Sequence, residues 1–160
     1  MTTFIEGGVT AAKGFQAAGV HCGIRKNRAK KDLGLIVSDR PASAAAVYTR
    51  NLVKGAPLTV TQAHIADGRA RAIVCNSGIA NTCAFDGIEK AEAMCALTAE
   101  ALGIDAADVV VASTGVIGPS IDIAPIAAGL PRLAAALSAQ GSADAAEAIM
   151  TTDTRKKEFA

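Results

Sequence analysis

Three polar segments of this 160-residue chain hold the residue types that could bind or transform a small polar molecule. They are residues 76–83 (NSGIANTC), 113–118 (STGVIG) and 150–157 (MTTDTRKK). Each is expected where a helix or strand ends, because side chains and backbone amides can face a ligand there. The three segments are therefore the candidate sites of chemistry.

The segment 113–118 is the most informative of the three. The apolar run 109–112 (VVVA) predicts a buried strand that ends at Ser113. A strand that stops at Thr114 and Gly115 presents a hydroxyl beside a backbone N–H, and glycine permits a close approach and an unusual φ. Two donors aimed at one point are what an oxyanion requires. An ordinary tight turn, in which Thr114 caps the next segment, is the alternative that spacing alone favours.

Other reaction classes find less support in the sequence. Gly115 and Gly118 give only Gly-x-x-Gly followed by proline, which is not the dinucleotide fingerprint, and the phosphate-loop pattern is absent. A nucleophile elbow is also absent, so no base is indicated for Ser113. The four cysteines contain no Cys-x-x-Cys pair and the chain has two histidines, so no metal site is predicted and the thiols are expected to be reduced.

The segment 150–157 combines hydroxyls, an acid and cations. Thr151 and Thr152 could hold the carboxylate of a zwitterionic substrate while Asp153 holds its amine. The same residues could instead be the end of a helix, with cations near the negative end of its dipole. Local physics does not separate these two interpretations.

The charge distribution excludes some partners. The formal net charge is +1, so the basic excess that a nucleic-acid binder needs is missing, and no apolar run reaches membrane-spanning length. The run 25–31 (RKNRAKK) is the basic exception. It could bind phosphate or an acidic substrate, but we favour a solvated loop because no aromatic or glycine-rich element accompanies it.

The elements that must position these segments follow from the apolar pattern. Hydrophobic residues make up 51% of the chain and charged residues 19%, so the chain should fold, and we expect one domain over residues 1–160. Asp86 as N-cap and Gly103 as terminator predict a helix between them. The other expected strands are 14–23, 33–38, 44–49, 58–61 and 70–75, with turns at 39–41 and 76–83; the other expected helices are 61–66, 121–137 and 142–150. Alternation in the second half favours an α/β fold with helices packed on a sheet.

Five collinear segments together resemble a known family. They are GVTAAKGFQAAGVHCGI (8–24), DLGLIVSD (32–39), AIVCNSGIANTC (72–83), VVVASTGVIG (109–118) and AEAIMTTDT (146–154). These segments are similar to the first part of the ornithine acetyltransferases, the arginine-biosynthesis enzymes also called glutamate N-acetyltransferases. The similarity covers nearly the whole chain, and STGVIG with MTTDT is its most specific part.

This resemblance implies a function. The family transfers acetyl from N-acetylornithine to glutamate through an acetyl-threonine, without a cofactor, and some members accept acetyl-CoA as donor. The precursor cleaves itself into α and β chains, and the threonine at the new β N-terminus is the nucleophile, with its own amine as base. Thr114 and Gly115 match the family's oxyanion-hole pair, and Thr151 matches a substrate-contacting threonine.

The resemblance also carries expectations about assembly. It implies a layered α/β sandwich with a mixed sheet, incomplete without the β chain, in a cytoplasmic heterotetramer of two α and two β chains. Ile79 and Lys156 stand where the family has Asn and Pro, and no Met-Ala-Thr cleavage motif precedes Ala160. We therefore expect a truncated α segment that is inactive alone. The alternatives are a non-catalytic binding or assembly fragment, and an N-terminal-nucleophile aminopeptidase of the wider fold group.

Overall fold

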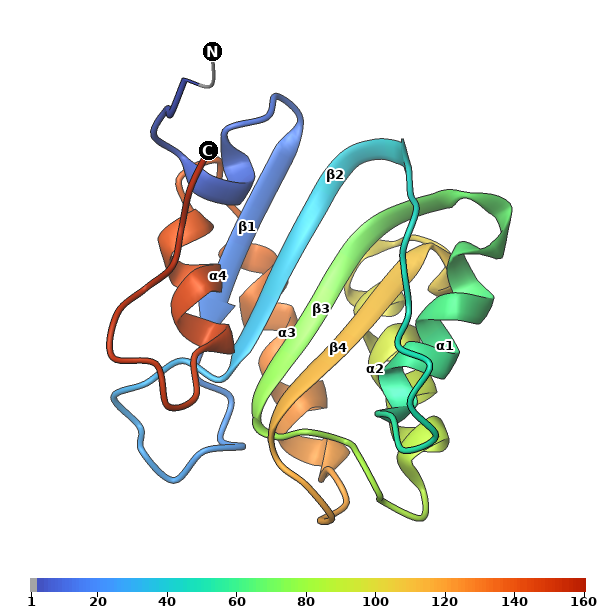
Figure 1. Ribbon diagram of the computed structural model, residues 1–160. Coiled ribbons are helices and arrows are strands. Elements are labelled where there is room, and N and C mark those ends of the chain that lie inside the picture. Colours follow the sequence, from blue (N-terminus) through green and yellow to red (C-terminus); the bar gives the residue numbers. More distant parts are fainter. Residues whose placement is uncertain (1–2) are drawn as a thin grey trace.

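The structure is a computed structural model that describes residues 3–160, and it has an α/β architecture (Figure 1). Its four-stranded sheet has the order β1-β2-β3-β4. The strands are β1 (Phe15–Val20), β2 (Leu33–Ser43), β3 (Arg69–Ile79) and β4 (Val109–Val116). β2 pairs antiparallel with both β1 and β3, whereas β3 and β4 are parallel. The expected mixed sheet with helices packed on it is therefore confirmed.

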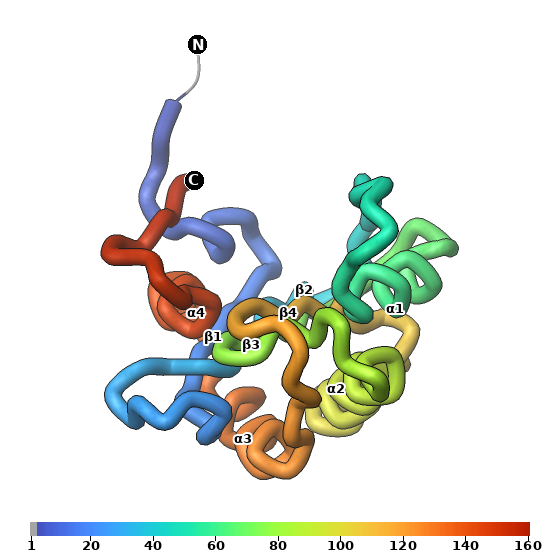
Figure 2. The backbone as a smooth tube through the Cα atoms, turned by 60° about the horizontal axis from the view of Figure 1, so that its bottom comes forward, coloured from blue at the N-terminus to red at the C-terminus, as the bar shows by residue number. Residues whose placement is uncertain are grey.

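Four helices surround this sheet: α1 (Ala56–His64), α2 (Gly87–Leu102), α3 (Ile123–Ala135) and α4 (Ser142–Ile149). Figure 2 shows α2 and α3 on one face of the sheet and α4 on the other. α4 contacts mainly β1 and β2, and α1 lies along β4. The face of the sheet on which α4 lies is therefore covered by a helix only in part. Short 3₁₀ turns occupy Gly8–Thr10, Ile65–Asp67 and Ala106–Asp108.

The hydrophobic core lies between the sheet and the helices α2 and α3. Along β3 the side chains alternate, so Val74 is fully buried in this core while Ile73, on the opposite face, is 41% exposed. Burying each such aliphatic side chain contributes about 1.5–3 kcal/mol. The largest core side chains are Leu33, Leu35, Met94, Ile121, Ile126, Leu130 and Leu133.

Helix α2 begins and ends where its sequence signals place it. Asp86 is the N-cap residue, and Gly103 ends the helix in the left-handed conformation with φ 65°. The Asp86 carboxylate makes no capping bond; it accepts a 2.6 Å hydrogen bond from the Ser120 hydroxyl. That bond, together with the nearby Lys90 ammonium, holds the pKa of Asp86 below its usual value. The start of α2 is thereby tied to the loop that follows β4.

Two expected strands in the first half are wrong. Residues 44–55 contain no helix or strand, and residues 58–61 belong to helix α1. Pro57 explains the second error, because proline within the first helical turn presets the helical φ and needs no N–H partner. The expected turn at 39–41 lies within β2, where the register shifts between Val37 and Ala42.

Strand β3 continues through residues that are typical of turns. It was expected to end at Cys75 but runs to Ile79. Its polar side chains find partners that make this possible: Asn76 Nδ2 donates to the Ile79 carbonyl at 2.9 Å, and Ser77 Oγ donates to the Ala148 carbonyl at 2.5 Å. The contact of Ser77 with α4 and the pairing of β3 with β4 therefore outweigh the local turn preference. Among residues 3–160, no helix is long and apolar enough to cross a bilayer.

Candidate functional site

Thr114 and Gly115 lie near the carboxyl end of the parallel strand pair. In the register of β3 and β4, Thr114 is opposite Ser77 and Gly115 is opposite Gly78. The expectation that the strand ends at Ser113 is wrong, because the ladder continues to Val116. Thr114 is half-buried and Gly115 is exposed. The carboxyl ends of parallel strands are where α/β proteins bind ligands, so this position suits a site.

Gly115 occupies a position that requires glycine. Its φ is +135°, a conformation that other residues rarely adopt. A Cβ added there would lie 2.3 Å from the carbonyl carbon and oxygen of Gly78 and 2.7 Å from the Ile79 nitrogen. Both the backbone angle and the close approach therefore exclude a side chain at Gly115.

The free edge of β4 is covered by α1 over its first half. Thr61 Oγ1 donates to the Val111 carbonyl at 3.1 Å and accepts the Val111 N–H at 3.3 Å. His64 Nδ1 donates to the Val109 carbonyl at 2.9 Å. The backbone groups of Val109 and Val111 therefore point away from β3, and α1 satisfies them where an edge strand would otherwise leave them open.

The same alternation gives the direction of the Gly115 amide. Val116, one residue on, points its carbonyl toward the β3 side and accepts the Ala80 N–H at 2.9 Å. Backbone groups alternate in direction along a strand, so the Gly115 N–H points the same way as the Val111 N–H, away from β3 at the edge of the sheet. Gly115 lies four residues beyond Val111, so its amide faces the open part of the edge.

The side chain of Thr114 lies on the same face of the sheet as α4. Its register partner Ser77 has its hydroxyl bonded to Ala148 of α4, and register partners present their side chains on the same face. Ser113 faces the opposite side with Asn76, and the Ser113 hydroxyl is buried with no hydrogen-bond partner within residues 3–160. Thr114 and Ser113 thus serve different surfaces.

Thr151 follows the C-terminal end of α4. It is half-buried and directly follows Met150, the C-cap residue of that helix. Its neighbour Asp153 forms a 2.6 Å ion pair with Lys157. The Lys157 ammonium and the Thr151 N–H hold the pKa of Asp153 below its usual value. Asp153 is therefore an ionised group with a cation already beside it.

The structure brings the Thr114 and Thr151 segments to the same end of the sheet. β4 ends at the lower edge in Figure 1, and the chain leaves α4 toward that edge. The Ser77 bond to Ala148 fixes the last turn of α4 on β3, opposite Thr114 in the ladder. Strand β3 therefore lies between β4, which carries Thr114, and the end of α4, which precedes Thr151.

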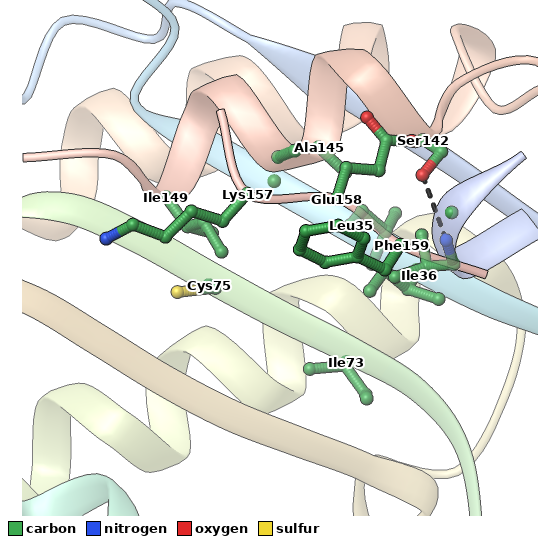
Figure 3. A pocket seen from close by; sticks show the side chains of 14 residues that line it. Leu35, Ile36, Ile73, Cys75, Ser142, Ala145, Ile149, Lys157, Glu158 and Phe159 are labelled. Carbon is green, nitrogen blue, oxygen red and sulfur yellow. Dashed lines mark hydrogen bonds between the residues drawn. The ribbon is translucent and has the colours of Figure 1, made fainter. Parts of the chain in front are cut away.

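An apolar cavity of ≈ 190 Å³ lies on the α4 side of the sheet (Figure 3). Ile36 and Ile73 from the strands face Ile149 and Phe159 across it, and the Cys75 thiol lies on its floor. A second cavity of ≈ 320 Å³ shares Ile36 and Ile73 and extends to Val110. We call the side chains Ile36, Ile73, Cys75 and Val110 the open sheet face.

Cys75 and Cys95 are not activated nucleophiles in this structure. Burial raises the pKa of the Cys75 thiol to about 12, so the thiol is protonated at neutral pH. Cys95 is fully buried in the core. Its pKa is raised to about 12, mainly by burial and to a smaller extent by the nearby Glu92 charge. Among residues 3–160, no group of three or more His, Cys, Asp or Glu side chains is arranged to hold a metal ion.

Sequence reasoning missed one buried charge, the carboxylate of Asp32. It is fully buried and accepts the N–H groups of Cys22 at 2.6 Å, Arg25 at 2.9 Å and Gly23 at 3.2 Å. Burial acts to raise the pKa of Asp32, but the N–H bonds from Arg25 and Cys22 outweigh it, and the pKa is lowered. A single acid between a basic run and an apolar strand was the available signal.

Asn81 was also missed. It is buried with φ 49°, its side-chain Nδ2 donates to the Gly87 carbonyl at 2.9 Å, and its own carbonyl accepts the Ala56 N–H at 3.0 Å. Asparagine adopts this left-handed conformation more readily than most residues. Asn81 therefore joins the starts of α1 and α2 to the end of β3.

The fold defines a class: an α/β chain with a mixed four-stranded sheet, helices packed on that sheet and an open apolar sheet face. The ArgJ family model matches residues 16–160. The chain belongs to the ArgJ family, as the resemblance predicted.

Relatives and solved structures agree. The Arginine biosynthesis bifunctional protein ArgJ of Symbiobacterium thermophilum is 50% identical over 159 residues, which are 98% of this chain and 40% of that protein. The protein of the same name from Bacillus subtilis is 46% identical over 152 residues, 94% of this chain and 36% of that protein. The chain therefore spans about 40% or less of the length of these curated relatives.

Two crystal structures have the same fold. The arginine biosynthesis bifunctional protein ArgJ of Bacillus halodurans has a TM-score of 0.87 and 45% identity, covering 96% of this chain and 81% of that chain. The ornithine acetyltransferase of Mycobacterium tuberculosis, complexed with ornithine, has a TM-score of 0.90 and 38% identity, covering 97% of this chain and 85% of that chain.

Proposed function

We propose that this chain is the α portion of an acetyltransferase that moves acetyl from N-acetylornithine to glutamate. Thr114 and Gly115 supply the oxyanion hole, and Thr151 contacts the substrate. The observation that carries this proposal is the position of Thr114 and Gly115 near the end of β4, where the register turns the Gly115 amide outward and Gly115 is exposed. Membership of the ArgJ family and the ornithine bound to the Mycobacterium relative support the substrate class.

In the proposed reaction, a threonine on the β portion attacks the acetyl carbonyl of N-acetylornithine. The carbonyl oxygen becomes an anion, and the Thr114 hydroxyl and Gly115 N–H donate to it. The amine of the N-terminal threonine takes the hydroxyl proton and returns it to the ornithine amine as the C–N bond breaks. The glutamate amine then attacks the acetyl-threonine, and the same two donors hold the new oxyanion. The amine proton passes to the threonine oxygen as the ester C–O bond breaks, which regenerates the threonine.

The missing nucleophile is proposed to come from a β portion produced by autocatalytic cleavage. The open sheet face supports this part, because Ile73 is 41% exposed and two apolar cavities adjoin it. The larger size of the curated relatives supports it as well. In this proposal residues 1–160 form a single domain, two α and two β portions assemble in the cytoplasm, no cofactor is needed, and acetyl-CoA is an alternative donor.

The test supplies the missing part in trans. This chain is co-expressed with the part of the Symbiobacterium thermophilum relative that lies outside the match, and acetyl transfer from N-acetylornithine to glutamate is measured. Transfer by the complex, with none by either part alone, is expected. A folded complex without transfer would contradict the enzyme proposal and favour a non-catalytic assembly fragment. Peptide hydrolysis in place of transfer would favour the aminopeptidase alternative.

A further inference from the structure

We propose that Arg25 is a positioning residue. It holds residues 151–154, which we call the Thr151 turn, in place beside β3 and β4, near Thr114 and Gly115. This inference rests on the proposed function, because it concerns the geometry of the same site. Arg25 comes from the basic run 25–31, which sequence reasoning treated as a solvated loop. Three independent contacts separate Arg25 from the rest of that run.

The first contact is between the Arg25 side-chain stem and β3. A Cβ added to Gly78 would lie 3.3 Å from Arg25 Cγ and 3.0 Å from Ile24 Cγ2. The stem therefore packs directly over the Gly78 backbone. Gly78 is the register partner of Gly115 and touches it. Arg25 is thus separated from the Gly115 backbone by one glycine residue.

The second contact is between the guanidinium of Arg25 and the end of α4. Arg25 Nη2 donates a hydrogen bond to the Met150 carbonyl. This carbonyl belongs to the C-cap residue of α4 and directly precedes Thr151 in the chain. A hydrogen bond from a charged donor is stronger than a neutral one, so it fixes where the Thr151 turn leaves the helix.

The third contact fixes the backbone of Arg25 itself. Asp32 Oδ2 accepts the Arg25 N–H at 2.9 Å, and Asp32 is fully buried. The Asp32 carbonyl in turn accepts the Ser77 N–H at 2.9 Å, and the Ser77 hydroxyl binds Ala148. Asp32 therefore joins the loop to β3, and Ser77 joins β3 to α4, so the backbone of Arg25 is held in place.

The other cations of the run differ from Arg25. Lys26, Arg28 and Lys30 are exposed, as a solvated loop requires, whereas Arg25 is half-buried. Lys31 also reaches α4, through an ion pair with Asp144. The loop is therefore attached to α4 at both ends, and Arg25 is the attachment next to Thr151.

Because Arg25 acts through Met150 and does not touch reacting atoms, its loss should affect substrate binding more than the chemical step. Replacing Arg25 with methionine keeps the apolar stem over Gly78 and removes the donor. We expect the KM for N-acetylornithine to rise about tenfold, the scale of a lost charge-assisted hydrogen bond, and kcat to change less than about twofold. Arg25→Lys, which keeps one charged donor, should recover part of the loss.

The experiment compares Arg25→Met with Arg28→Met, which removes the same charge from an exposed position of the same loop. KM and kcat are measured in the complemented enzyme, and hydrogen exchange of the amides of residues 151–154 is measured in the 160-residue chain. Arg25→Met should raise both KM and exchange at residues 151–154, while exchange in β3 and β4 and all properties of Arg28→Met stay at wild-type values.

Two outcomes of the methionine variants would overturn the inference: Arg25→Met with wild-type KM and exchange, or Arg28→Met with the same effect as Arg25→Met. If Arg25→Met loses exchange protection throughout β3 and β4, Arg25→Lys decides: a folded Arg25→Lys chain with faster exchange only at residues 151–154 supports the positioning role, and loss of protection throughout β3 and β4 in Arg25→Lys as well overturns it. The exchange readout needs no activity. An inactive wild-type complex would therefore count against the proposed function while leaving this contact tested.

Discussion

Gly115 lies against the backbone of Gly78 so closely that a Cβ on Gly115 would come within 2.3 Å of the Gly78 carbonyl. The two glycines are register partners on the parallel strands β3 and β4. The contact fixes how closely β4 lies against β3 at the point where the Gly115 amide points outward. The position of the proposed oxyanion donors therefore depends on two residues without side chains.

Gly115→Ala should destabilise the chain by roughly 3 kcal/mol. About 1–2 kcal/mol comes from the strained φ, and the remainder from the overlap with Gly78. Urea denaturation measures the loss. Gly118→Ala is the matched control, because Gly118 also has a positive φ, of 106°, but a Cβ there meets nothing within 4 Å. Equal losses for the two variants would show that the Gly78 contact contributes nothing.

Thr114→Ala should slow acetyl transfer by the complemented enzyme by roughly 10²-fold or more, the scale of losing one oxyanion donor. Thr114 is half-buried near the end of β4, so the fold should survive the change. Thr114→Ser keeps the hydroxyl and should retain most of the rate. A Thr114→Ala enzyme with the wild-type kcat would remove Thr114 from the oxyanion role.

Asp32→Asn should destabilise the chain at neutral pH and flatten its stability at low pH. The native pKa of Asp32 lies below its usual value of 3.8, because the N–H groups of Arg25 and Cys22 outweigh burial. The ionised carboxylate therefore contributes stability that is present above pH 3.8 and is lost as the pH falls through the native pKa. We expect a loss of about 2–3 kcal/mol at pH 7, since asparagine leaves buried N–H donors unpaired.

Denaturant titrations of both proteins from about pH 6 to about pH 2 test this expectation. The wild-type free energy of unfolding should fall toward that of Asp32→Asn as the pH decreases below 3.8. A constant difference between the two proteins over the whole range would show that the charge of Asp32 is not responsible.

The sequence predicted the second half of the fold better than the first. Helix α2 carries its own start and stop signals at Asp86 and Gly103, and the structure confirms both positions. The strand expected at 44–49 is wrong because its apolar residues have no sheet neighbour in the structure; Val47 is 99% exposed. Apolar character alone does not distinguish a strand from an apolar loop.

The site was predictable only in part. The apolar run before Thr114 and Gly115 draws attention to them, but their spacing alone favours an ordinary turn, and the resemblance supplies the oxyanion role. Arg25 could not be found in this way, because its partner Met150 is distant in the sequence. Contacts between residues so far apart depend on the finished fold, and a single sequence does not contain them in any local pattern.

Thr151→Val should raise the KM for N-acetylornithine about three- to tenfold, the scale of a lost neutral hydrogen bond. Valine has nearly the shape of threonine, so the half-buried side chain keeps its packing. Thr152→Val is the control, since Thr152 is the exposed neighbour in the same turn. Equal effects of the two substitutions would assign substrate contact to the turn as a whole and would contradict a specific role for Thr151.

Ile73→Lys should weaken association of this chain with the complementing part at least tenfold, without unfolding the chain. Ile73 is 41% exposed on the open sheet face, so a lysine there reaches solvent in the isolated chain but is buried when a partner covers the face. Ile88→Lys is the control, because Ile88 is 46% exposed on α2, which covers the opposite face. Titration calorimetry gives the affinity and urea denaturation gives the stability of each variant. If Ile73→Lys associates as tightly as the wild type, the open sheet face is not where the complementing part docks. The complementing part must then bind another surface of the chain.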